Sequence, residues 1–158
     1  MQSDSSGAFR TGREALGLIA PGAGGESEAQ LLLSCLWAGR AVPELVGEVR
    51  TLLEQPRSDP SGEPTPAELV RVSMQAHDDL LRGRRRRAAE RLDWVARQPA
   101  ELFEDDFTPT VLALGLAQAF CGLDREAEAT LGRALAQARR HGNKLYMGTS
   151  LDGLAYLR

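Results

Sequence analysis

The sequence has few of the residues on which base stacking, disulfide scaffolds and membrane anchoring depend. Aromatic residues make up 5% of its 158 residues, too few for a platform on which single-stranded bases stack. Cys35 and Cys121 are the only cysteines; they make no disulfide framework, and with His77 and His141 they show no zinc-binding spacing. The chain has no bilayer-length apolar run and no charged-then-apolar leader, so we expect a cytoplasmic protein without membrane contacts.

Catalytic motifs are also missing. The only lysine, Lys144, is followed by Leu145, so the chain has no Gly-x4-Gly-Lys-Ser/Thr phosphate loop. Its serines stand in no recognisable Ser/His/Asp context, and no paired carboxylates can be argued. The net charge of −3 argues against a dedicated nucleic-acid binder. We therefore predict that the chain is not an enzyme, needs no cofactor and reaches DNA only through a domain outside it.

Two regions differ in composition. Residues 1–26 are rich in Ser and Gly and include the run Pro21–Gly25, which predicts a flexible N-terminal segment or linker. Within it, we expect residues 1–10 to be poorly ordered and a short helix over about residues 13–20. From Ser27 onward the chain alternates helical stretches with short breaks, so residues 27–158 are predicted to form an all-α domain.

The helical stretches share start signals, stop signals and apolar stripes. Capping-box pairs stand at Ser27/Gln30 and Thr65/Glu68, each before an apolar run. Apolar residues then recur on one helix face. The three stripes are Leu45, Val49, Leu52 and Leu53; Ala88, Leu92, Val95 and Ala96; and Ala127, Leu131, Ala134, Leu135 and Ala138. The segment 111–120 is apolar nearly all round, which predicts the most buried helix.

Glycines divide this pattern into repeats. A shift of 39 residues maps Gly83 onto Gly122, and an earlier round places Gly39 44 residues before Gly83. A period near 40, with a helix, a tight Gly turn and a second helix in each unit, is typical of an α-solenoid. Two short helices bury their apolar faces only when a neighbouring pair stacks on them. The sequence thus predicts three stacked hairpins and an incomplete fourth, as in a piece of a longer protein. In this register Trp37 aligns with Phe120 and is expected in the core.

The unit from Phe120 to Asn143 resembles a tetratricopeptide-like repeat, with Gly122 at the turn and Ala127, Leu131 and Ala134 at the family's second-helix positions. The strict period of that family is about 34. The longer period and the trailing Arg-Arg-His-Gly-Asn are more similar to the helical arm of large ATP-binding LuxR-type (MalT-like) transcription regulators. The resemblance implies an arm that binds an effector or a partner protein, between a nucleotide-switch module and a C-terminal helix-turn-helix.

The first helices of the predicted units would line a groove, the default surface for a peptide or a small effector. The residues predicted around it are Gln75, Asp78, Asp79, Gly115 and Gln118. A run of arginines comprises Arg82, Arg84, Arg85, Arg86, Arg87 and Arg91. One interpretation is a contact with phosphate or nucleic acid. The other is a solvated helix start whose positive charge is balanced by the acidic residues Glu101, Glu104, Asp105 and Asp106.

Trp94 and His77 have two interpretations each, and the two cysteines have one. Trp94 aligns with Arg133, an outward position, and either covers a neighbouring unit or marks a contact surface. His77 falls where the next unit has Leu116, so a histidine at the edge of the core is favoured over a metal or acid–base site. The two cysteines are predicted to be small buried hydrophobes without an activating base.

These observations predict a protein- or effector-binding helical repeat domain, which the resemblance places in a bacterial transcriptional regulator. The alternative is a structural adaptor in a multiprotein assembly without an effector pocket. A ligand-sized cavity among the first helices would favour the effector, and a flat apolar patch near Trp94 would favour the adaptor. An uncovered last helix also makes a homo-oligomer a candidate assembly.

Overall fold

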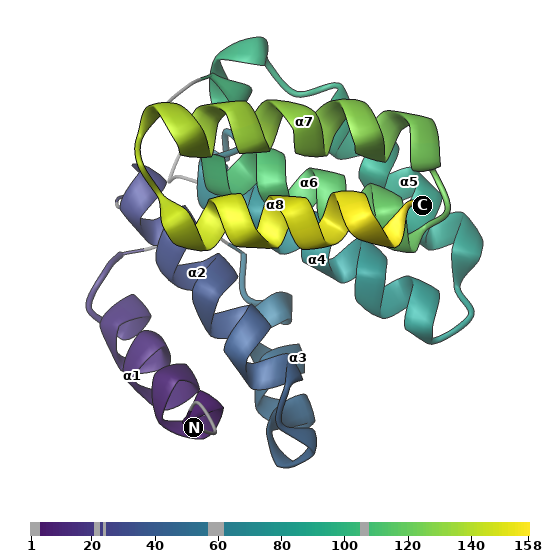
Figure 1. Cartoon of the computed structure of the whole chain (residues 1–158). Helices are drawn as coiled ribbons and strands as arrows, with labels where there is room; N and C mark the ends of the chain where they lie inside the picture. Colours follow the sequence, from purple (N-terminus) through teal and green to yellow (C-terminus); the bar gives the residue numbers. More distant parts are fainter. Residues whose placement is uncertain (1–3, 21–22, 24, 57–61, 105–107) are drawn as a thin grey trace. The chain divides into compact units, whose positions relative to one another are not determined.

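The structure of the chain is a computed structural model that describes residues 4–20, 23, 25–56, 62–104 and 108–158. Within those ranges every regular element is a helix and no strand occurs (Figure 1). The chain divides into two compact units, Met1–Arg71 and Val72–Arg158. This boundary differs from the predicted one at residues 26 and 27, and each unit is described by itself below.

The first unit begins with a helix where a flexible segment was predicted. Helix α1 spans Ser5–Gly17, and the side chain of Asp4 accepts a hydrogen bond of 2.8 Å from the backbone N–H of Gly7. Phe9 and Leu16, seven residues apart on one face, are 0% and 1% exposed because α1 packs along α2 (Gly25–Arg40). The expected poor order over residues 1–10 is therefore wrong for the described residues 4–10. The predicted short helix over about residues 13–20 overlaps α1 only in part, because α1 begins eight residues earlier and ends at Gly17.

Gly39 does not end a helix as predicted. Helix α2 continues to Arg40, and Gly39 is buried within it. A Cβ atom added at Gly39 would lie 2.5 Å from the side chains of Phe9 and Val49, so this glycine allows close packing rather than a turn. Because Gly39 and Gly83 have different roles, the predicted equivalence of the first round fails. Trp37, expected in the core, is 43% exposed.

The rest of the first unit follows the predicted pattern. A 3₁₀ helix, η1 (Pro43–Leu45), leads into α3 (Val46–Glu54), and the stripe of Leu45, Val49, Leu52 and Leu53 is buried as predicted. Helix α4 spans Pro66–Leu81, and Thr65 Oγ1 accepts the Glu68 N–H at 3.2 Å, which confirms the Thr65 cap. Arg71 bonds Glu68 and donates to the Leu53 carbonyl at 2.8 Å, so it ties the start of α4 to the end of α3.

The second unit contains the end of α4, then α5 (Arg85–Ala96), the 3₁₀ helix η2 (Ala100–Phe103), α6 (Thr108–Phe120), α7 (Asp124–Arg140) and α8 (Lys144–Tyr156). Helix α7 runs along α6, and α8 packs against both of them (Figure 1). Every residue of α6 from Thr108 to Ala119 is buried, as predicted for the most apolar helix. The α7 stripe is fully buried, whereas in α5 Ala88, Leu92 and Val95 are buried and Ala96 is exposed.

Leu131 joins the three last helices. Its side chain is 0% exposed. A Cβ atom added at Gly115 of α6 or at Gly153 of α8 would lie 2.9 Å from it. The two glycines therefore leave space into which Leu131 of α7 packs, and this contact allows α6 and α8 to lie close to α7.

Three turns of the second unit share one backbone geometry. Gly83, Gly122 and Gly142 have φ angles of 74°, 73° and 64°, in the left-handed region that glycine adopts without strain. At Gly122, the glycine N–H bonds the Ala119 carbonyl at 3.1 Å and the next N–H bonds the Gln118 carbonyl at 3.0 Å. The same two bonds occur around Gly83 and Gly142. Each helix thus ends in a Schellman motif, and Gly83 and Gly122, which the 39-residue shift aligns, share the same backbone turn.

Candidate functional site

Asp79, in the last turn of α4, is the centre of an arginine cluster. Its side chain is 3% exposed, and it accepts hydrogen bonds from Nε of Arg84 and Nε of Arg91, both at 2.7 Å. Arg87 lies 3.7 Å away, and Arg91 also donates to the amide oxygen of Gln75. The turn at Gly83 brings the start of α5 back beside α4. Arginines of the turn and of α5 therefore meet the Asp79 carboxylate at the end of α4. We call these residues the Asp79 cluster: Gln75, Asp79, Arg84, Arg87 and Arg91.

The charge on Asp79 is set by two opposing effects. Burial by itself raises the pKa of this carboxyl group, because it disfavours the charged form. Hydrogen bonds from Arg91 and Arg84, together with their positive charges, outweigh burial and hold the pKa of Asp79 below its ordinary value. The carboxylate is therefore ionised at neutral pH and neutralises part of the arginine run.

The remaining arginines have other partners or project outward. Asp78 pairs with Arg82 at 2.9 Å and lies 3.6 Å from Arg84. Arg86 pairs with Glu90 at 2.8 Å on the outer face of α5, where its side chain is 93% exposed. Arg85 is exposed at the first position of α5. The acidic partners of the arginine run are therefore Asp78, Asp79 and Glu90, and not the predicted Glu101 and Glu104. The predicted Asp105 and Asp106 lie outside the described residues.

The predicted groove residues do not all reach the surface. Asp78 is partly exposed, but Asp79 lies within its cluster, and Gln118 of α6 is 8% exposed. Gly115 is enclosed by Leu131. Trp94 of α5 is 39% exposed, which agrees with its predicted outward position. Much of the predicted groove set is therefore buried, and a ligand bound at the surface would contact other residues.

A stack of aromatic rings joins helices α4, α6 and α8. The His77 ring of α4 lies 4.2 Å from the Phe120 ring of α6, with planes 16° apart, and Phe120 meets Tyr156 of α8 edge-on at 5.7 Å. We call His77, Phe120 and Tyr156 the aromatic strip. Tyr156 is 67% exposed, and Leu81, one helical turn after His77 on α4, is 72% exposed. The sequence pattern did not predict the strip, because its contacts join residues 77, 120 and 156, which lie far apart in the chain.

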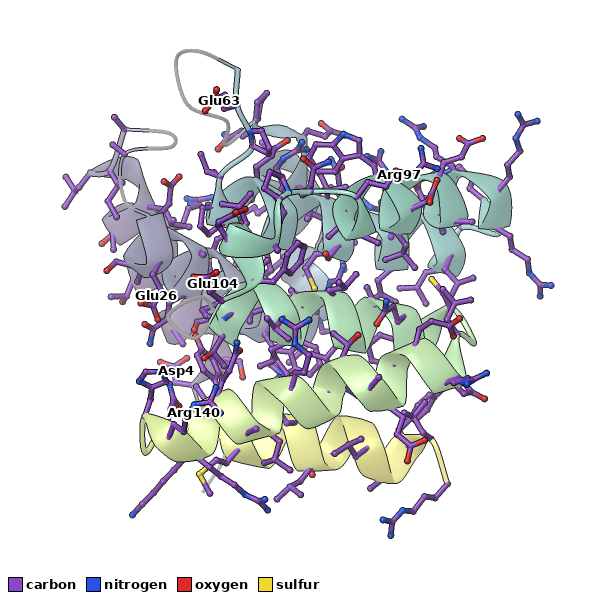
Figure 2. All side chains as sticks on the ribbon, turned by 90° about the horizontal axis from the view of Figure 1, so that it is seen from above. Asp4, Glu26, Glu63, Arg97, Glu104 and Arg140 are labelled. Carbon is purple, nitrogen blue, oxygen red and sulfur yellow. The ribbon has the colours of Figure 1, made fainter. Side chains whose placement is uncertain are left out.

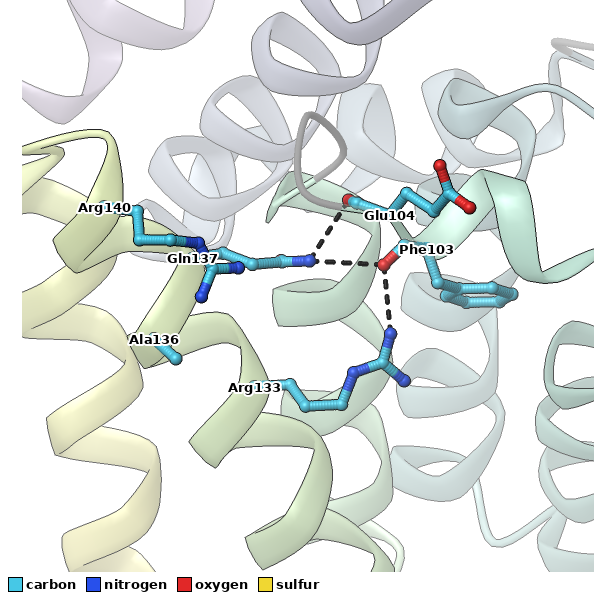
Figure 3. Close-up of a pocket in the computed structure, with 6 residues that line it drawn as sticks. All are labelled: Phe103, Glu104, Arg133, Ala136, Gln137 and Arg140. Atoms are coloured by element: carbon cyan, nitrogen blue, oxygen red, sulfur yellow. Dashed lines mark hydrogen bonds between the residues drawn. The ribbon is translucent and has the colours of Figure 1, made fainter.

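A cavity of about 460 Å³ lies beside α7 and η2 (Figure 3). Its lining residues are Phe103, Glu104, Arg133, Ala136, Gln137 and Arg140. Arg133 donates to the Phe103 carbonyl at 3.0 Å, and Gln137 Nε2 donates to the Phe103 and Glu104 carbonyls at 3.2 and 3.1 Å. Seen from above, Glu104 and Arg140 lie at the same end of these helices (Figure 2). The polar side chains mainly satisfy the carbonyls that end η2, so they hold this connection against α7.

A second cavity, of about 340 Å³, lies in the first unit. It is lined by Arg13, Leu16, Gly17, Glu48, Thr51, Leu52 and Gln55, and Arg13 pairs with Glu48 across it. This ion pair joins α1 to α3, and both of its side chains are about half-exposed. An exposed pair of this kind contributes little to stability.

Among the described residues, no three His, Cys, Asp or Glu side chains are grouped so as to hold a metal ion. Cys35 is buried, as predicted, with its Sγ 3.4 Å from the Phe9 carbonyl oxygen. Cys121 is half-buried, and burial raises the pKa of its thiol, which disfavours the reactive thiolate. No helix in the described ranges combines the length and the apolar character needed to span a membrane.

No protein-family model, curated protein or solved structure matches this chain. A functional proposal therefore depends on the residues and geometry described above and on the resemblance in the sequence.

Proposed function

We propose that this chain is a non-enzymatic binding module that holds a peptide segment of a partner protein against the aromatic strip. The observation that carries the proposal is the ring stack from His77 through Phe120 to Tyr156, which ends in a side chain that is 67% exposed. Exposed aromatic side chains held rigidly by their neighbours are typical of the residues that dominate protein interfaces. Phe120 is fixed between two rings, so a partner would lose little side-chain entropy on binding it.

Charge beside the strip indicates the chemistry of the peptide. The segment from Asp78 to Arg91 contains six arginines and three acidic residues, in a chain whose net charge is −3. This local positive charge favours a peptide that combines an apolar or aromatic anchor with acidic residues beside it. The anchor would pack between Leu81 and Tyr156, and the acidic residues would face the exposed arginines at the start of α5.

The proposal includes a tetratricopeptide-like architecture for the second unit. Helices α4–α5 and α6–α7 would be successive hairpins, and α8 would stack on the second of them. Two observations support this assignment: the matching turns at Gly83 and Gly122, and the packing of α8 against both α6 and α7, as expected for the next helix in a stacked array. The repeat period near 40 and the trailing Arg-Arg-His-Gly-Asn at residues 139–143 resemble MalT-like regulator arms, which supports placing the module in a bacterial transcription regulator.

Peptide selection tests this proposal. Random peptides displayed on phage are selected on the immobilised chain, and enriched peptides are measured by fluorescence polarisation. We expect enrichment of peptides with an aromatic or Leu anchor and acidic flanks, and a loss of binding in the Tyr156→Ala variant. Leu18→Ala is the control, because Leu18 is 90% exposed and lies in the first unit, outside the aromatic strip. Failure to enrich any peptide, or equal binding by both variants, contradicts the proposal.

A structural adaptor that docks through Trp94 is the second candidate. Trp94 is 39% exposed on α5 and takes no part in the aromatic strip, and tryptophan is enriched among residues that dominate interfaces. The same selection separates the two candidates: the adaptor predicts that Trp94→Ala, and not Tyr156→Ala, abolishes binding of the enriched peptides.

A further inference from the structure

The outer face of α8 has no partner among the described residues. The inner face of this helix buries Tyr146, Ser150 and Gly153 against α6 and α7. On the outer face, Leu145 and Leu151 are 65% and 47% exposed. We call the outer residues the α8 face: Lys144, Leu145, Gly148, Leu151, Asp152 and Ala155, all of which are exposed. With 3.6 residues per turn, they lie within an arc of about 120°.

The centre of the α8 face is open to a close approach. A Cβ atom added at Gly148 would meet nothing within 4 Å. A glycine at the middle of an exposed helix face lets a second helix backbone come near, and the leucines on either side supply apolar surface. Lys144 and Asp152 stand four residues before and four residues after Gly148, so opposite charges lie at equal distances from the centre.

We propose that two copies of this chain associate through the α8 face, with the two α8 helices antiparallel about Gly148. A two-fold axis at Gly148 sets Lys144 of one copy opposite Asp152 of the other, twice. It also sets Leu145 opposite Leu151 and the two Gly148 residues against each other. A surface that matches itself in this way is what a symmetric interface requires.

The charge pattern is what selects a second copy as the occupant. A purely acidic or purely basic partner would leave either Lys144 or Asp152 opposite a like charge, which is unfavourable. A second α8 face in the antiparallel direction pairs both charges, whereas a parallel one would set like charges together. The association and the proposed peptide site use different residues, because the α8 face includes none of His77, Phe120 and Tyr156.

Charge reversal tests the pairing. Sedimentation equilibrium measures the dimer dissociation constant of the wild-type chain, of Lys144→Asp, of Asp152→Lys and of the double variant. Each single variant sets like charges opposite each other twice, so we expect a roughly ten-fold weaker dimer. The double variant restores both pairs with reversed polarity and should regain most of the affinity, which a folding defect would not allow.

Cysteine cross-linking tests the position of the axis. In a Cys121→Ser background, Gly148→Cys brings two thiols together at the two-fold axis and should form a disulfide-linked dimer under mild oxidation. Gly132→Cys is the control, because Gly132 is also a helical glycine with open space around an added Cβ but lies on α7. A wild-type chain that stays monomeric overturns the proposal. So do a dimer that neither single charge variant weakens, a double variant as weak as the singles, and equal cross-linking of the two cysteine variants.

Discussion

Gly83 of the α4–α5 hairpin and Gly122 of the α6–α7 hairpin end their helices with φ angles of 74° and 73° and the same pair of backbone hydrogen bonds. The side chains around these turns differ completely. Where the first hairpin has Asp79 and Arg84, the second has Gln118 and Leu123. The comparison shows that the backbone of the turn depends on the glycine and its hydrogen bonds, and that the chemistry inside the hairpin varies independently of it.

The two hairpins are consequently stabilised by different interactions. The α4–α5 hairpin depends on a buried carboxylate that holds Arg84 and Arg91. The α6–α7 hairpin depends on apolar packing, with Leu131 against Gly115. A buried ion pair is sensitive to the loss of one partner, because the other charge is left without compensation. An apolar contact is sensitive to the loss of volume.

The largest expected effect is in the apolar hairpin. Leu131→Ala removes a fully buried side chain that contacts both α6 and α8, and it should lower the free energy of unfolding by about 3–5 kcal/mol. Urea denaturation followed by circular dichroism measures the change. Leu123→Ala is the control, since Leu123 is 38% exposed and its loss leaves no cavity. Similar losses in the two variants would show that α6–α7 does not depend on this contact.

Removing the charge from the ionic hairpin comes next. Asp79→Asn keeps the shape of the side chain but removes the carboxylate that Arg91 and Arg84 share, and leaves Arg84 with Asp78 at 3.6 Å. We expect the free energy of unfolding to fall by about 2–3 kcal/mol, less than for a fully enclosed pair because both arginines are partly exposed. Glu90→Gln removes an exposed partner of Arg86 and should cost about 0.5 kcal/mol or less. Equal effects would mean that the Asp79 cluster is only a surface feature.

The shared turn predicts equal, smaller effects in the two hairpins. Gly83→Ala and Gly122→Ala each force a residue with a Cβ into the left-handed region, and each should cost about 1–2 kcal/mol. A Cβ atom meets nothing within 4 Å at either position, so the cost comes from backbone conformation alone. Thermal and urea unfolding of both variants, with Gly132→Ala as a helical control that should be neutral or stabilising, measure it. Clearly unequal costs would break the equivalence of the two turns.

Local patterns in the sequence predicted the second unit better than the first. The apolar helix α6, the stripe of α7 and the turn glycines could be predicted because each depends on residues close together in the chain. Gly39 could not, because its role depends on Phe9, which lies thirty residues earlier and packs against it only in the folded unit. In a helical sequence pattern, a glycine that ends the helix cannot be distinguished from one that lets another side chain pack closely against the helix.

The candidate site shows the same limit. The arginine run and Asp79 were evident separately, but their pairing depends on the turn at Gly83, which brings α5 back beside α4. The sequence pointed instead to the acidic stretch after α5, which is nearer to the end of that helix than to its start. The ring stack depends on contacts between residues 77, 120 and 156, and such distant pairs leave no periodic trace in a single sequence.

The smallest expected effect is a difference in pH dependence between the hairpins. The pKa of Asp79 in the folded chain lies below its ordinary value of 3.8, so its ionised form stabilises the fold. This contribution is fully present above that ordinary value and is lost as the pH falls through the lower pKa of the folded state. The stability difference between the wild type and Asp79→Asn should therefore be constant from pH 5 to 7, and shrink below about pH 4. Gln118→Ala, the counterpart in the α6–α7 hairpin, removes no titrating group, so its stability difference should stay constant over the same range. Urea midpoints measured at each pH provide the test, and parallel curves for wild type and Asp79→Asn would contradict an ionised, arginine-bound Asp79.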